Sequence, residues 1–266
     1  MRRPLLFLAF WLLGSLVLAF ILVPLLALVA APGLTGLLQA AALPDVRAAI
    51  GLSLGAALVT AAFAAVFGVP LAYVLARSAF PGKGVVEAIV DLPLTVPHTV
   101  AGIALLLAFG RNGAFGEPAA AWFGLRFWST FAGIVVAMLF VSLPYAVNAA
   151  RIGFEEAIDP HLEKVARTLG AGPWRVFTRI ALPLAWRGVM AGITLTFARA
   201  ISEFATVALL AYYPMTAPIK IYELFLSFGL GASTGAAVLF LAVVLLLFIV
   251  LRQLAYGRGG HRGFGR

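Results

Sequence analysis

Six long apolar runs constrain this chain more than any other feature of its sequence. They cover approximately residues 5–30, 48–76, 86–110, 130–150, 188–211 and 231–254. A helix needs about 20 apolar residues to cross the hydrocarbon core of a bilayer. Hydrophobic residues make up 63% of the chain and charged residues only 11%, whereas soluble domains are about a quarter charged. The sequence therefore predicts an all-α polytopic membrane protein with six transmembrane helices in a single domain, residues 1–266.

The composition gives no sign of an enzyme active site. The chain has no cysteine, and its three histidines, His98, His161 and His261, are too far apart to suggest a metal site. Gly82-Lys83 lacks both the upstream glycine and the following hydroxyl residue of a phosphate-binding loop. We therefore expect no cofactor in this chain, and if ATP drives the protein, another chain binds the ATP and its magnesium.

The loops between the runs differ in their basic residues, and this difference predicts the topology. Bases expected on one side of the membrane are Arg2, Arg3, Arg77, Lys83, Arg151, Lys164, Arg167, Arg175, Arg179, Arg187, Arg252, Arg258, Arg262 and Arg266. Those expected on the other side are Arg47, Arg111, Arg126 and Lys220. The richer side is normally cytoplasmic, which places both termini and the loop 151–187 in the cytoplasm of a multi-pass protein. The net charge of +9 then comes from basic residues in loops near the lipid, and it does not indicate nucleic-acid binding.

The loop 151–187 contains two short amphipathic helical patterns. Asp159 can cap the first helix, Pro160 suits its first position, and Gly170 can take the left-handed conformation at its end. Gly172-Pro173 restarts the chain. The second pattern has an apolar stripe and a basic face, formed respectively by Trp174, Phe177 and Ile180, and by Arg175 and Arg179. Helices this short need a partner surface, either the membrane or another protein.

The same loop contains a motif at Ala166, Gly170, Ile180, Leu182 and Pro183. In these positions it resembles the cytoplasmic coupling loop of bacterial ABC importer permeases. Lys164 stands where that family usually has a glutamate, with Glu163 beside it, and Val165 replaces the first alanine of the motif. The resemblance implies the type I ABC importer permease fold, with this loop contacting a cytoplasmic ATPase.

Two of the apolar runs contain polar or helix-breaking residues. Pro93 and Pro97 are expected to break the third run, with His98 in the break. Arg199 and Glu203 lie one helical turn apart in the fifth run, at a depth where charge is costly. They either form a salt bridge that orients the helix, or Arg199 lines the path of an anion with Thr196, Ser202 and Thr206. The candidate pathway residues are thus Arg199, Ser202, Glu203, Thr206, Pro93, Pro97 and His98. Glu87 and Asp91 are interpreted as interfacial charges.

Two further stretches carry distinctive motifs. One is the proline-rich segment 91–107, and the other is the segment 198–223, which contains Ala-Arg-Ala-x-x-Glu-Phe, Tyr-Tyr-Pro-Met-x-Ala-Pro and Ile-Tyr-Glu. Both stretches resemble the molybdate/tungstate branch of these permeases. The resemblance implies an ATP-driven importer of molybdate or tungstate with two copies of this subunit, two ATPase subunits and an external oxyanion-binding protein.

Three other interpretations remain open from the sequence. The first is a sulfate or thiosulfate permease of the same type. The second is a secondary transporter that uses Glu203 or Asp91 as a proton site, although no repeated half is visible in the sequence. The third is a membrane anchor or sensor without transport activity, which would not copurify with an ATPase.

Overall fold

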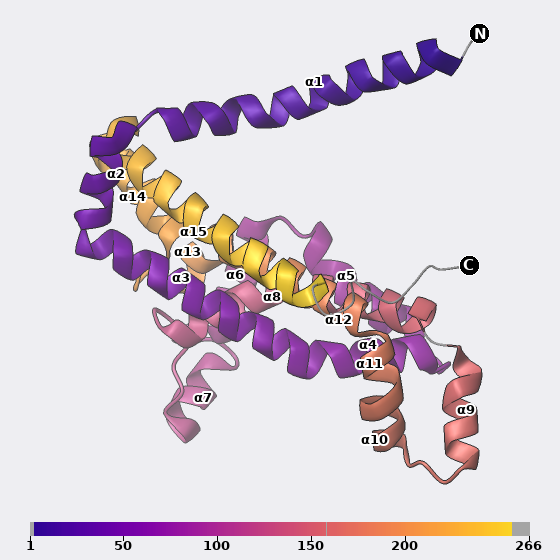
Figure 1. Ribbon diagram of the computed structural model, residues 1–266. Helices are drawn as coiled ribbons and strands as arrows, with labels where there is room; N and C mark the ends of the chain where they lie inside the picture. Colours follow the sequence, from indigo (N-terminus) through magenta and orange to yellow (C-terminus); the bar gives the residue numbers. More distant parts are fainter. Residues whose placement is uncertain (1–2, 158, 257–266) are drawn as a thin grey trace. The chain divides into compact units, whose positions relative to one another are not determined.

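The computed structural model describes residues 3–157 and 159–256, and within these residues the regular elements are helices (Figure 1). In chain order they are α1 (Arg3–Ala30), α2 (Gly33–Ala42), α3 (Pro44–Phe63), the π-helix η1 (Ala64–Gly68), α4 (Val69–Arg77), α5 (Lys83–Thr95), α6 (His98–Phe109), α7 (Gly116–Phe123), α8 (Phe131–Ala157), α9 (Pro160–Thr168), α10 (Pro173–Val176), the π-helix η2 (Phe177–Ala181), α11 (Leu182–Leu184), α12 (Trp186–Ile201), α13 (Ala205–Leu210), α14 (Ala217–Phe228) and α15 (Leu230–Tyr256). The predicted all-α class is confirmed.

Several of these helices are long and apolar enough to cross a membrane. Four qualify alone: Leu6–Ala30, Pro44–Arg77, Phe131–Ala157 and Leu230–Leu251. Two further helix pairs qualify if each counts as one span, with bends of 114° between α5 and α6 and of 77° between Pro173–Leu184 and α12. The chain is thus a multi-pass membrane protein, while the exact span limits and the single domain stay predictions.

Three of the segments between the predicted transmembrane helices also contain helices. These helices are α2, α7 and α14. Each has a proline at or next to its first turn: Pro32, Pro118 and Pro218. A proline there removes only an N–H group that has no partner inside the helix. Each of these prolines is therefore compatible with the start of its helix.

Two compact units make up the chain, residues 1–48 with 220–243 and residues 49–219 with 244–266. In the first unit, α2 and α15 approach closely at glycine, because a Cβ on Gly235 would lie 2.6 Å from the carbonyl oxygen of Gly36. Lys220 in the same unit pairs with Glu223 at 2.7 Å and Asp45 at 3.8 Å.

In the second unit the core forms where α8 packs against α4 and α12. Leu75, Val147 and Phe154 are among its fully buried side chains. Small residues allow α8 and α12 to approach, because a Cβ on Gly188 would lie 2.6 Å from the Cα of Gly153. Close approach at glycine is a common way for helices to associate in membranes, where dispersion contacts replace the hydrophobic effect.

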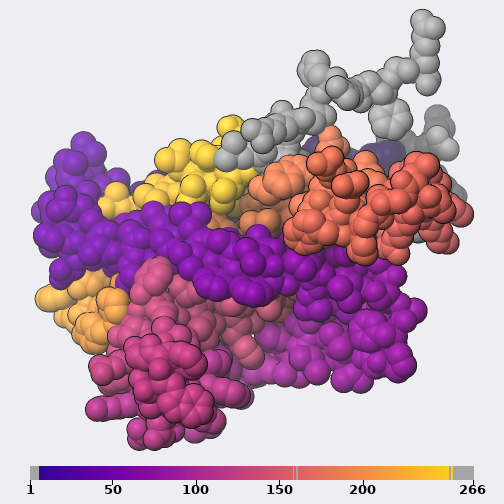
Figure 2. Space-filling view, turned by 90° about the horizontal axis from the view of Figure 1, so that it is seen from below, coloured from indigo at the N-terminus to yellow at the C-terminus, as the bar shows by residue number. Residues whose placement is uncertain are grey.

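Helix α8 also separates the two functional ends of this unit. It has 27 residues and is therefore about 40 Å long. The segment around α7 precedes its first residue, and the hairpin formed by α9 and α10 follows its last one. Figure 2 shows the magenta α7 segment and the salmon α9–α10 segment as separate surface features.

Candidate functional site

The hairpin formed by α9 and α10 is built as the local sequence chemistry predicts. The Asp159 carboxylate accepts a hydrogen bond from the backbone N–H of His161 at 2.9 Å and so caps α9. Gly170 has a φ of +86°, which the turn requires and which a side chain would strain. Pro173 then begins α10. Figure 1 shows these two helices side by side with a turn between them.

One buried carboxylate fastens α9 to the transmembrane helices. Glu163 is only 4% exposed, and its Oε1 accepts a hydrogen bond from Nε of Arg77 at 2.8 Å. The Tyr73 hydroxyl donates to Oε2 of Glu163 at 2.9 Å, and Nη2 of Arg77 donates to the Phe154 carbonyl at 2.7 Å. Glu163 therefore connects α9 to α4, and Arg77 extends this connection to α8.

Aromatic packing fastens the second half of the hairpin. The Phe177 ring lies 5.0 Å from the Tyr73 ring and 6.2 Å from the Phe154 ring, measured between centroids. Val176 and Ala181 are fully buried beside it. The outer face of the hairpin is uncovered and partly apolar, and its exposed side chains include Leu162, Val165, Leu169, Trp174, Arg175, Arg179 and Pro183. The remaining predicted loop residues, Ala166, Ile180 and Leu182, are half-buried.

The proline break lies at one of its two expected positions. Helix α5 continues through Pro93 to Thr95, so the expectation of a break at Pro93 was wrong. The chain instead turns at Val96, whose ψ of 128° is extended, immediately before Pro97. The ring of a proline disfavours the helical conformation in the residue before it, which explains why the break falls there.

The fifth apolar run is also broken, which the sequence analysis did not anticipate. Helix α12 ends at Ile201 and α13 begins at Ala205. Oε1 of Glu203 accepts hydrogen bonds from the N–H and the hydroxyl of Thr206, at 3.0 and 2.7 Å. The N–H groups in the first turn of a helix have no partners inside the helix. Glu203 lies just before Phe204, the N-cap residue of α13, and its carboxylate satisfies one of these N–H groups.

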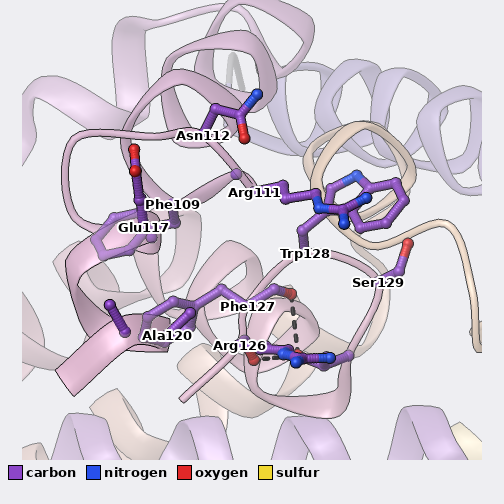
Figure 3. Close-up of a pocket in the computed structure, with 13 residues that line it drawn as sticks. Phe109, Arg111, Asn112, Glu117, Ala120, Arg126, Phe127, Trp128 and Ser129 are labelled. Atoms are coloured by element: carbon purple, nitrogen blue, oxygen red, sulfur yellow. Dashed lines mark hydrogen bonds between the residues drawn. The ribbon is translucent and has the colours of Figure 1, made fainter. Parts of the chain in front are cut away.

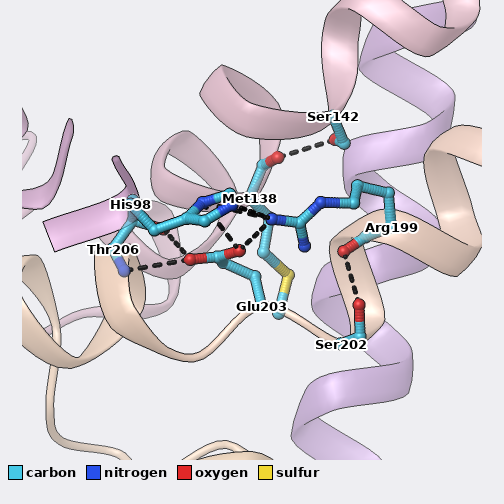
Figure 4. Close-up of polar contacts among 7 residues, drawn as sticks. All are labelled: His98, Met138, Ser142, Arg199, Ser202, Glu203 and Thr206. Atoms are coloured by element: carbon cyan, nitrogen blue, oxygen red, sulfur yellow. Dashed lines mark hydrogen bonds and ion pairs between the residues drawn. The ribbon is translucent and has the colours of Figure 1, made fainter. Parts of the chain in front are cut away.

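The two breaks meet in a set of polar side chains that we call the central ion cluster: His98, Arg199, Glu203 and Thr206 (Figure 4). Nη2 of Arg199 lies 2.7 Å from Oε2 of Glu203 and 2.8 Å from Nε2 of His98. Nδ1 of His98 lies 3.5 Å from Oε2 of Glu203. The three side chains are accessible to different degrees: 44% for His98, 21% for Arg199 and 3% for Glu203.

The other pathway candidates lie in different environments. Ser202 is exposed, and its hydroxyl donates to the Arg199 carbonyl at 3.0 Å. Thr196 is fully buried and donates to the Ser142 carbonyl at 3.2 Å. The salt bridge that the sequence suggested is present, and His98 and Arg199 are the accessible members of the cluster.

Two polar pairs between α5 and α8 were missed by the sequence analysis. The Asn148 side-chain amide donates to the Asp91 carboxylate at 2.6 Å, and Arg151 pairs with Glu87 at 2.7 Å. The spacing in the sequence could have indicated these pairs. Glu87 and Asp91 are four residues apart and share one face of α5, and Asn148 and Arg151 are three apart and share one face of α8. Among the described residues, no group of three or more potential ligands could hold a metal ion.

Residues 68–258, which contain both the hairpin and the central ion cluster, match the family model described as a binding-protein-dependent transport system inner membrane component. The chain belongs to this family. The molybdate/tungstate transport system permease protein WtpB of Thermococcus kodakarensis is 44% identical over 256 residues, covering 96% of this chain and 98% of that protein. The molybdenum transport system permease protein ModB of Escherichia coli K12 is 39% identical over 207 residues, covering 76% of this chain and 90% of that protein. These relatives are permease subunits rather than enzymes.

Solved structures show that the fold is that of ABC importer permeases. A bacterial ABC transporter involved in the import of the acidic polysaccharide alginate matches with a TM-score of 0.78 at 18% identity, covering 97% of this chain and 98% of that one. The MetNI methionine ABC transporter matches with a TM-score of 0.61, also at 18% identity, covering 80% of this chain and 95% of that one. The predicted type I importer permease fold is confirmed.

Proposed function

We propose that this chain is the transmembrane permease subunit of an ATP-driven importer for molybdate or tungstate. Its family is that of binding-protein-dependent transport systems, and its relatives at 37–44% identity are named for molybdenum, or for molybdate and tungstate. These names favour this substrate branch over a sulfate or thiosulfate permease. The engaged carboxylates of Glu203 and Asp91 also argue against a secondary transporter that uses either as its proton site.

The observation that carries the proposal is the hairpin of α9 and α10. Its inner side is fixed by Glu163 and Phe177, while its outer side exposes Leu169 and Trp174 together with Arg175. A rigid element with an uncovered apolar face is suited to dock in a groove of another protein. The partner that fits is a cytoplasmic ATPase, which would hold ATP and magnesium. When the ATPase closes, a hairpin fixed in this way would move α4 and α8 with it.

The same proposal assigns the remaining partners. The excess of basic residues on one side supports a cytoplasmic position for the hairpin and both termini, with the chain in a cell membrane and the segment around α7 outside. An external oxyanion-binding protein would then deliver substrate on the α7 side. By analogy with the family, two copies of this subunit would assemble with two ATPase subunits.

The central ion cluster is the proposed contact for the anion within the membrane. Nη2 of Arg199 is held by Glu203 and His98, while no described residue bonds its Nε or Nη1. Those N–H groups can donate to oxygens of a tetrahedral anion. Glu203 and Thr206 are nearly buried, so they act as positioning residues that hold Arg199. The helices are interrupted before His98 and between Ile201 and Ala205, and membrane proteins tolerate such interruptions inside the protein or along a watery cavity.

The test is ATP hydrolysis by the permease and its cognate ATPase in lipid, with the binding protein loaded with tungstate, molybdate, sulfate or nothing. Stimulation by tungstate and molybdate alone is the expected result. Stimulation by sulfate would retain the importer and change the substrate. A permease that binds no ATPase would refute the proposal and favour a secondary transporter or an anchor.

A further inference from the structure

A pocket of about 670 Å³ lies between the end of α6 and the start of α8. Its lining includes two arginines, one glutamate and one tryptophan, namely Arg111, Arg126, Glu117 and Trp128. Figure 3 shows the Arg111 side chain extending toward the Trp128 ring, with Glu117 near Phe109. The pocket is at the opposite end of α8 from the hairpin, so the proposed topology places it on the outer side.

The charged groups of the pocket have no partners among the described residues. Neither Arg111 nor Arg126 takes part in a side-chain hydrogen bond or ion pair within residues 3–157 and 159–256, and both are exposed. They are two of the four bases that the sequence places on the outer side. An arginine held without a carboxylate at a pocket wall is available to an acidic ligand.

The pocket is framed by backbone that has little room to move. A Cβ on Gly110 or Gly113 would clash with the carbonyl oxygen of Leu106 or Ala108 near the end of α6, and a Cβ on Gly116 would clash with that of Gly110. The Phe109 ring packs against Phe115 and Phe127, with centroids 5.8 and 5.2 Å apart. A pocket whose frame is already ordered loses little conformational entropy when it binds a partner.

The pocket is connected to the central ion cluster by two helices. Helix α6 begins at His98 and ends at Phe109 in the pocket wall. Helix α13 begins after Glu203 and ends at Leu210, whose carbonyl accepts a hydrogen bond from the N–H of Ser129 in the pocket at 3.3 Å. The two helices pack tightly, because a Cβ on Gly102 would lie 2.7 Å from the Leu209 side chain.

We propose that this pocket receives an acidic segment of the external binding protein, and that α6 and α13 transmit this docking to the central ion cluster. The inference rests on the proposed function. At about 670 Å³ the pocket is far larger than a four-oxygen anion. Its mixture of arginine, tryptophan and neutral polar groups is typical of protein interfaces. The side chains of a protein loop therefore fit it better than a free oxyanion.

The test compares the double variant Arg111→Gln/Arg126→Gln with the control Arg47→Gln, which removes an exposed outer arginine outside the pocket. Each permease is assembled with its ATPase in nanodiscs of neutral lipid, and the binding of the molybdate-loaded binding protein is measured at several salt concentrations. We expect the double variant to bind at least 10-fold more weakly, with a shallower salt dependence. The control should bind like the wild type, and both variants should keep wild-type thermal unfolding and ATPase copurification.

Three results would overturn the inference while the wild type still binds the binding protein. Equal binding by the double variant would show that the arginines are not contacts. If the double variant lost binding of the binding protein only in nanodiscs of anionic lipid, the arginines would be assigned to contacts with lipid headgroups. If molybdate without the binding protein stimulated the ATPase in the wild type but not in the double variant, the pocket would be assigned to the free oxyanion. A wild-type complex that binds no binding protein would instead overturn the proposed function as well.

Discussion

Nε of Arg77 lies 2.8 Å from Oε1 of Glu163, and this pair connects the end of a transmembrane helix to the first helix of the hairpin. Both side chains are largely shielded from water, and Tyr73 bonds the second oxygen of the carboxylate. Ion pairs that are shielded and fully hydrogen-bonded are far more costly to break than surface pairs. The hairpin therefore has to move with α4.

Replacing Glu163 with Ala should loosen the hairpin without unfolding the transmembrane core. The variant leaves Tyr73 and Arg77 without their shared acceptor. Hydrogen bonds to charged groups contribute about 1.5–3 kcal/mol each, so amide hydrogen exchange in residues 160–181 should become at least about 10-fold faster. In the assembled transporter, ATP hydrolysis should then be less dependent on the loaded binding protein.

The matched control is Glu156→Ala, which removes an exposed carboxylate just before the hairpin. It should leave both the exchange rates and the stimulation of ATP hydrolysis unchanged. If Glu163→Ala behaved like this control, the carboxylate would not be what holds α9 in place.

Replacing Arg199 with Ala should lower substrate uptake while the transporter still assembles. The change removes the guanidinium on the accessible side of the central ion cluster, and leaves the buried Glu203 carboxylate with only His98 and Thr206 as partners. A lost interaction of about 1.4 kcal/mol corresponds to a factor of ten, and a buried contact to an anion should exceed it. Uptake of molybdate into proteoliposomes should fall at least 10-fold.

The conservative variant Arg199→Lys separates charge from geometry. Lysine keeps the positive charge but cannot donate from two planar nitrogens at once, so uptake should be intermediate. Normal uptake by Arg199→Ala with intact assembly would rule out a role in the pathway and leave only the salt bridge that orients α12.

Replacing Gly188 with Ala should destabilise the packing of α8 against α12. The new Cβ would lie 2.6 Å from the Cα of Gly153, and a backbone atom cannot rotate away. Overpacking of this kind costs about 1–3 kcal/mol, which should lower the midpoint of thermal unfolding in detergent. Gly55→Ala is the control, because no atom lies within 4 Å of its added Cβ. A Gly188→Ala protein as stable as that control would contradict the close approach.

Local chemistry in the hairpin could be predicted because it depends on neighbouring residues. Asp159 caps α9 and Gly170 ends its turn as the sequence indicates, since both effects act within a few positions of the chain. The same holds for the helix break before Pro97, where the proline itself restricts Val96.

Contacts between distant segments could not be predicted in this way. Glu163 is 86 residues away from Arg77 along the chain, and no periodicity shows that it turns inward while Leu162 and Val165 face outward. The end of α12 was missed for a related reason. Glu203 was assigned to a salt bridge with Arg199, which is present. Its second oxygen also accepts from the N–H of Thr206 in the first turn of α13, and the apolar run has no proline or glycine at that point to indicate a break.

Replacing Trp174 with Ala should weaken the association of the permease with its ATPase. The Trp174 side chain is 75% exposed on the outer face of the hairpin, although its ring still contacts Phe177 at 5.9 Å. Tryptophans buried at the centre of an interface often contribute about 2 kcal/mol or more to binding, so the dissociation constant should rise about 30-fold. Charge reversal at Arg175 and Arg179 should weaken the same association, because both side chains share the exposed face.

Trp122→Ala provides the comparison. Trp122 is 79% exposed, similar to Trp174, but it lies on α7 at the other end of α8. Copurification of the ATPase should therefore be unaffected by Trp122→Ala. Equal losses in both variants would point to a general effect of removing a surface tryptophan, and unchanged copurification in Trp174→Ala would move the ATPase contact away from this face of the hairpin. A loss of ATPase copurification confined to Trp174→Ala would assign the docking surface to the side of the hairpin opposite Glu163. Movement of the ATPase would then be transmitted to α4 through the Glu163 carboxylate.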